Sequence, residues 1–216
     1  MDFPIEVRRG KGKNGVVLIH DIMGLDKQNL QFGERLNADG YWVAHVDLFA
    51  GARPKTVQDG FAEKGKLTRA AIVAGLKAGY DRLTKDIGAG AKVGAMGFCM
   101  GGGAALQGAC TTPFRFCVDY YGMLEDVADV KGLQGPLLLI LASEDDNINP
   151  WAYSKLLPAL DAEKKRVQMQ LYPATVHPFH RPDWVKSPFG GMKAYDEAAS
   201  EDSWKRVFAF IKEQVA

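Results

Sequence analysis

Cys99 stands at the centre of a glycine-rich segment that could carry nucleophilic chemistry. Residues 97–103 read Gly-Phe-Cys-Met-Gly-Gly-Gly, directly after an apolar run and before a stretch of small residues. The pattern G-x-C-x-G is equivalent to G-x-S-x-G, in which a tight strand-to-helix turn holds the nucleophile at a sheet edge. The helix that follows directs its N-terminal amides toward Cys99, which favours a thiolate and can stabilise an oxyanion. Taken alone, the segment is equally compatible with a buried cysteine in a common turn.

Two later segments supply candidates for the base and the acid of a nucleophilic triad. The apolar run at residues 137–142 is followed by an acidic loop at residues 143–150, and His177 lies in the loop after the last apolar run. Nucleophile, acid and histidine follow one another in this order along α/β-hydrolase chains. We therefore predict His177 as the general base and a carboxylate of the acidic loop as the group that orients it. A lone histidine or an acidic loop is more often structural or solvated, so the prediction depends on the shared order.

The serines and the other cysteines offer no competing site. Cys110 and Cys117 are interpreted as packed thiols, and three cysteines without a CxxC pair indicate neither a zinc site nor a disulfide framework. No serine lies in a G-x-S-x-G context, the five being Ser143, Ser154, Ser187, Ser200 and Ser203.

Short apolar runs alternate with helix-forming segments along the chain. This alternation predicts an α/β fold, with a mostly parallel sheet covered by helices on both faces, as one domain over residues 1–216. In such sheets the functional groups lie at the carboxyl ends of the strands. A looser stretch at residues 49–65 is predicted to form a lid or rim. The predicted strands are residues 16–20, 41–46, 92–98, 116–121, 137–142 and 167–172, and the predicted helices are residues 27–38, 66–83, 101–110, 151–161 and 194–215.

The charge balance excludes several classes of partner. The chain has 27 Lys and Arg against 26 Asp and Glu, so no net field favours nucleic acid or an anionic membrane. The first ten residues mix charged and apolar side chains, unlike a signal peptide, and no apolar run approaches the roughly 20 residues that span a bilayer. We expect a cytoplasmic protein that binds neither nucleic acid nor membranes.

The chain resembles the dienelactone hydrolase (carboxymethylenebutenolidase) family of the α/β-hydrolase superfamily at four separated places. These are residues 20–25, which read His-Asp-Ile-Met-Gly-Leu, and residues 97–103, 143–150 and 172–181. Gly-x-Cys-x-Gly-Gly is more specific to this family than the general nucleophile turn. The resemblance implies the α/β-hydrolase fold and a triad of Cys99, His177 and Asp146, with Asp145 as the close competitor for the acid.

The same resemblance assigns further site residues. Asp21 occupies a position where the family usually has a glutamate that contacts and helps activate the nucleophilic cysteine, and it is one methylene shorter. The backbone amides of Ile22 and Met100 would form the oxyanion hole. Arg181 ends the run His-Pro-Phe-His-Arg, which matches the family's His-Ser-Phe-x-Arg. A guanidinium there would bind a substrate carboxylate bidentately.

The expected reaction opens a lactone or enol ester through a thioester acyl-enzyme, without a metal or an organic cofactor. The substrate would be a small lactone or ester, including carboxylate-bearing ones, and the protein a monomer or weak dimer. A broader carboxylesterase or thioesterase using the same triad remains an alternative. From a different class, the fold could serve as a non-catalytic binding protein or a redox sensor with Cys99 as an oxidisable thiol.

Overall fold

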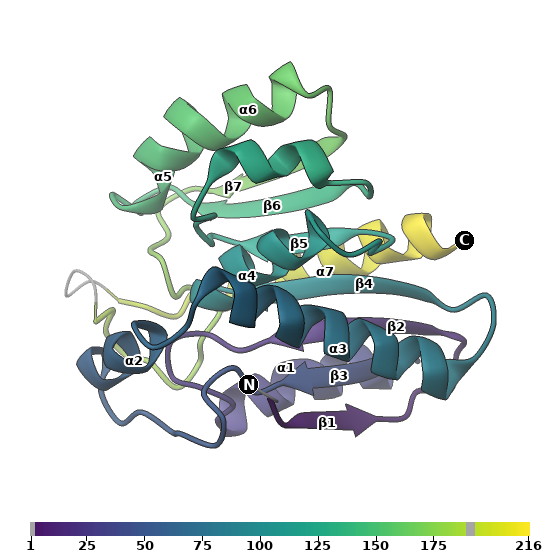
Figure 1. Ribbon diagram of the computed structural model, residues 1–216. Helices are drawn as coiled ribbons and strands as arrows, with labels where there is room; N and C mark the ends of the chain where they lie inside the picture. The colour runs from purple at the N-terminus through teal and green to yellow at the C-terminus, as the bar shows by residue number, and fades with distance from the viewer. Residues whose placement is uncertain (1–2, 189–192) are drawn as a thin grey trace.

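The computed structural model describes residues 3–188 and 193–216 and contains one twisted seven-stranded sheet (Figure 1). The strands lie in the order β1-β3-β2-β4-β5-β6-β7. All neighbouring pairs are parallel except β1, which pairs antiparallel with β3. Their bounds are β1 Ile5–Arg8, β2 Asn14–Ile19, β3 Trp42–Val46, β4 Lys92–Phe98, β5 Cys117–Tyr120, β6 Leu137–Ala142 and β7 Val167–Tyr172.

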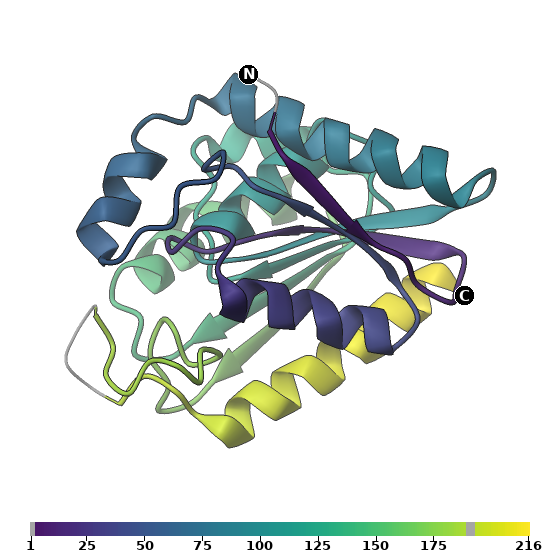
Figure 2. The same cartoon turned by 90° about the horizontal axis from the view of Figure 1, so that it is seen from below.

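Helices cover both faces of the sheet. Figure 2 shows α1 (Lys27–Ala38) and α7 (Glu197–Val215) below the strands and α3 (Arg69–Ile87) above them. The face of the sheet that α3 covers also carries α4 (Met100–Ala109). The helices α2 (Val57–Lys64) and α5 (Ile148–Trp151) lie at one end of the sheet in Figure 1. A π-helical turn at Ala152–Leu156 continues α5 into α6 (Leu157–Ala162), and a 3₁₀ helix spans Val127–Gly132.

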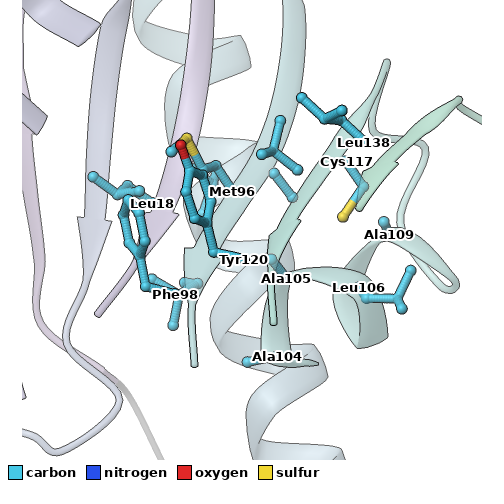
Figure 3. Close-up of a cluster of buried hydrophobic side chains, with 14 of the residues drawn as sticks. Leu18, Met96, Phe98, Ala104, Ala105, Leu106, Ala109, Cys117, Tyr120 and Leu138 are labelled. Atoms are coloured by element: carbon cyan, nitrogen blue, oxygen red, sulfur yellow. The ribbon is translucent and has the colours of Figure 1, made fainter. Parts of the chain in front are cut away.

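The helices on both faces of the sheet explain why the central strands are apolar throughout. Every residue of β6, which reads Leu-Leu-Leu-Ile-Leu-Ala, is buried. A parallel strand with helices on both faces has no solvent side, so its apolar residues run on continuously instead of alternating. Figure 3 shows part of the resulting core, with Met96, Phe98 and Tyr120 on the strands and Ala104 and Leu106 on α4. All ten residues of α4 are buried, and its small side chains allow close approach to the sheet.

The structure confirms the predicted α/β fold and locates all six predicted strands. It adds β1, a four-residue edge strand in which charged and apolar residues alternate, so it lacked the apolar run used to recognise the others. It also shows that residues 49–65, predicted as a lid or rim, contain the helix α2. No helix in the described part of the chain is long and apolar enough to cross a membrane.

Candidate active site

Cys99 occupies a strained turn between β4 and α4. Its backbone has φ 55° and ψ −120°, a left-handed φ that is uncommon for a residue with a side chain and costs of the order of 1–3 kcal/mol. The surrounding packing holds it there: the Cys99 amide donates to the carbonyl of Tyr120, and a Cβ added at Gly101 would collide with the carbonyl oxygen of His20. The turn therefore raises a partly exposed thiol at the carboxyl end of the sheet, above the first turn of α4.

His177 lies between Cys99 and an aspartate. Its Nδ1 is 2.6 Å from Oδ2 of Asp145, whose side chain is only 1% exposed. The other carboxylate oxygen of Asp145 accepts the backbone amides of Asn147 and Ile148 at 3.2 and 3.0 Å. These bonds fix the carboxylate, so it can orient the imidazole through Nδ1 and leave the other ring nitrogen for the sulfur.

The structure corrects the prediction that Asp146 pairs with His177. Asp146 is exposed to solvent, while Asp145 is buried against the imidazole. The reason is local: the amide of Asp145 bonds back to the carbonyl of Ala142 at the end of β6, and its side chain caps the turn that begins α5. In this turn Asp145 faces His177 and Asp146 faces outward.

The charges in the site favour a protonated histidine. Burial acts to lower the pKa of His177, but the negative charge of Cys99, hydrogen bonds to Asp145 and Cys99, and the charge of Asp145 raise it to about 10. At neutral pH the imidazole is therefore an imidazolium, which pairs with the Asp145 carboxylate and contacts the Cys99 side chain. By contrast, burial raises the pKa of Cys110 to about 12 and that of Cys117 well above its usual range, so these thiols are not nucleophiles.

The two residues whose backbone amides are predicted to form the oxyanion hole, Ile22 and Met100, lie at the same cavity as Cys99. Met100 is the first residue of α4, where a helix leaves its amides without intrahelical partners, and Ile22 lies in the loop that follows β2. Both residues line the same cavity as Cys99 and His177. The loop of Ile22 is supported from outside by α2, because Gly60 packs directly on the carbonyl of Ile22 and leaves no room for a Cβ. Gly60 is the buried residue of α2.

Asp21 and Arg181 are brought together in a buried charge cluster, beside a small pocket that Cys99 and His177 also line. Arg181 is 1% exposed and donates to Asp21 at 2.6 Å, to Asp26 at 2.6 Å and to Asp183 at 3.0 and 2.7 Å. The remaining oxygen of Asp21 accepts the amide of Met23 and the side chain of Asn29. Thus one oxygen of Asp21 is bonded to Arg181, and three carboxylates surround the Arg181 guanidinium. The roles predicted for Asp21 and Arg181 in activating the thiol and binding a substrate carboxylate stay predictions.

His20 and Tyr121 support the site without having been assigned to it. His20 Nδ1 lies 2.7 Å from the carbonyl of Asp21, and its Nε2 accepts the amide of Leu48, so the ring bridges two loops. Burial lowers the pKa of His20, which keeps it neutral for both bonds. Tyr121 has φ 41°, packs its ring 4.6 Å from that of His177 and places its hydroxyl against Nδ1 of His180. The sequence carries no pattern that marks this contact.

A cavity of about 780 Å³ opens over Cys99 and His177. Most of its walls are apolar, and apart from His177 its cationic side chains are Lys64 of α2 and Lys155 of the π-helical turn. In the part of the chain that the structure describes, no group of three or more His, Cys, Asp or Glu side chains is arranged to hold a metal ion.

The parallel sheet, the strained turn carrying the nucleophile and the order of the site residues define an α/β-hydrolase fold. Comparison with known sequences is more specific: the dienelactone hydrolase family matches residues 6–215, and the chain belongs to this family. It is accordingly a hydrolase of ester or lactone bonds, as the sequence predicted.

Individual relatives agree with this assignment. A carboxymethylenebutenolidase homolog of Xenopus tropicalis is 29% identical over 173 residues, covering 77% of this chain and 70% of that protein. The crystal structure of a dienelactone hydrolase-like promiscuous phosphotriesterase from metagenomic libraries superposes with a TM-score of 0.84 at 24% identity, covering 98% of this chain and 92% of that one. Another solved structure, named m3DLH, gives a TM-score of 0.88 at 23% identity over 99% and 93% of the two chains.

The first prediction concerns the proton on His177. NMR titration of the imidazole should show it protonated through neutral pH and losing its proton near pH 10. Asp145→Asn removes a charge that raises this pKa and should lower it, whereas Asp146→Asn, at an exposed neighbour, should leave it within a few tenths of a unit. A wild-type imidazole that titrates near its usual pKa of about 6.5 would contradict the ion pair.

The second prediction concerns the contact between α2 and the Ile22 loop. Gly60→Ala should displace the Ile22 amide and lower kcat/KM for p-nitrophenyl acetate by about tenfold or more, since loss of one oxyanion donor costs about a hundredfold or more. Gly65→Ala is the matched control, because its Cβ would lie 3.4 Å from the nearest atom. Circular dichroism checks that both variants fold. Equal activity of the two variants would show that α2 does not position Ile22.

Proposed function

We propose that the protein opens lactones and activated esters with Cys99 as the nucleophile, through a thioester acyl-enzyme. The observation that supports this most directly is the chain of contacts from Asp145 through His177 to Cys99 beneath an apolar cavity. In it, a buried carboxylate orients an imidazolium and the imidazolium stabilises a thiolate.

Acylation begins from this ion pair. The Cys99 thiolate attacks the carbonyl carbon, and the amides of Met100 and Ile22 stabilise the oxyanion of the tetrahedral intermediate. When the intermediate collapses, the carbon–oxygen bond of the ester breaks and His177 gives its proton to the departing oxygen. In a lactone the departing oxygen stays attached, so the ring opens and remains bound as a thioester.

Deacylation reverses the proton movement. His177, now neutral, takes a proton from water, and the hydroxide attacks the thioester carbonyl. Collapse of the second intermediate expels the Cys99 thiolate, and the acid product leaves as the ion pair is restored. Asp145 keeps the imidazole in the tautomer and orientation that both steps require.

A thiolate suits substrates whose leaving oxygen is stabilised, such as enol lactones and phenyl esters. The same residues could also hydrolyse a wider range of carboxylesters or thioesters, and substrate breadth is then decided by the cavity rather than by the triad. Because Arg181 is held by three carboxylates, a substrate carboxylate would meet Lys64 or Lys155 instead.

The third prediction tests the nucleophile. Cys99→Ala should lower kcat/KM for a dienelactone and for p-nitrophenyl acetate by at least about a thousandfold, because no other group forms the acyl-enzyme. Cys110→Ala is the matched control: it removes a buried thiol from the same helix region, and most activity should remain. Folding of both variants is verified by circular dichroism.

Either of two results would reject this proposal. Folded Cys99→Ala with wild-type activity would exclude Cys99 as the nucleophile. A wild-type protein that hydrolyses neither substrate would exclude the proposed reaction on these compounds.

A further inference from the structure

The two pockets beside Cys99 differ greatly in volume. The cavity of about 780 Å³ lies on one side of Cys99 and His177, whereas the pocket on the side of Asp21 and Arg181 measures only about 10 Å³. The smaller volume is about that of a single water probe, while the larger one corresponds to a site for a drug-sized ligand. A compact lactone would leave most of the larger cavity empty.

The floor of the large cavity runs along α4, away from the sulfur. Met100, Gly103, Ala104 and Gln107 all line it, and their spacing of three and four residues places them on one face of the helix. From Met100 to Gln107 this face is roughly 10 Å long, at about 1.5 Å per residue. A group joined to Cys99 through its carbonyl can therefore extend along α4 over small side chains.

The walls and the mouth are mostly apolar, although Lys64, Glu125 and Lys155 also line the cavity. Leu67 and Ile72 face the cavity from one flank, and Leu124, Ile148 and Trp151 from the other. At the mouth, Phe61 of α2 and Met123 of the loop after β5 are 51% and 45% exposed. Exposed large apolar side chains grouped around an apolar cavity mark a surface that is covered when a ligand binds.

We propose that this cavity is an acyl site for extended apolar groups, so that the preferred substrates are esters or lactones whose acyl part carries a medium-length alkyl chain or an aryl ring. This inference rests on the proposed function, since it requires the acyl group to be attached to Cys99. The thioester holds the carbonyl between Met100 and Ile22, and the substrate chain extends over Ala104 toward Gln107, past Gly103, on which the Met123 backbone packs. Phe61 and Met123 then cover it at the mouth.

The experiment compares p-nitrophenyl acetate, butyrate and octanoate below their micelle-forming concentrations. The leaving group is constant, so the ratio of kcat/KM for octanoate to that for acetate reports the acyl site alone. We expect this ratio to be at least ten in the wild type. A ratio of one or less, with acetate still hydrolysed in a Cys99-dependent manner, would overturn the acyl site and leave the proposed function standing.

A matched pair of variants locates the effect. Met123→Ser removes an apolar side chain at the cavity mouth and should lower the octanoate-to-acetate ratio at least threefold. Met169→Ser, at an almost equally exposed methionine (44%) on the edge strand β7 outside the cavity lining, should leave the ratio unchanged. An equal octanoate-to-acetate ratio in the two variants would show that the acyl chain does not contact Met123, and it would reject the inference. If the wild-type protein shows no Cys99-dependent hydrolysis of p-nitrophenyl acetate, the proposed function is rejected.

Discussion

The site depends on the close backbone packing that forces Cys99 into its strained turn. Gly101, in the first turn of α4, lies so near the carbonyl of His20 that even a methyl group would not fit. This contact joins the carboxyl end of β2 to the start of α4, and it brings the loop of Ile22 beside the helix that begins at Met100. The thiol, the helix N-terminus and the second amide thus share one small space, and the surrounding core offsets the strain of the turn.

Charge is divided between two networks that meet near the nucleophile. One contains Cys99, His177 and Asp145 and opens to the large cavity. The other contains Arg181 with its three carboxylates and is closed, with its guanidinium almost fully buried. A buried guanidinium needs such partners, because its desolvation is otherwise very costly. This second network joins the loop of Asp21 to the segment that follows His177.

The sequence predicted the features that follow from chain order and periodicity. Continuous apolar runs located the central strands, and chain order predicted Cys99 and His177, which the structure brings together at one cavity. Contacts that depend on the direction of a side chain in a loop could not be predicted from the sequence. Asp145 and Asp146 are chemically equal, and only the turn after β6 decides which one faces the imidazole.

Competition between partners set a second limit. The hydrogen-bond partners of Arg181 include Asp21 and Asp26, which are distant from Arg181 in the sequence and approach it only in the folded protein. The contact between Gly60 and Ile22 could not be predicted either, because Gly60 lies in residues 49–65, where the sequence shows no regular pattern.

The proposed reaction requires a thioester that forms on Cys99 and is hydrolysed with the help of His177. Wild-type protein turning over p-nitrophenyl acetate, quenched in acid during steady state and digested, can be examined by mass spectrometry. We predict an acetyl group on the peptide that contains Cys99, removable by hydroxylamine and absent from Cys99→Ala. An acetyl group on another residue at catalytic levels, with the Cys99 peptide unmodified, would contradict a reaction through Cys99.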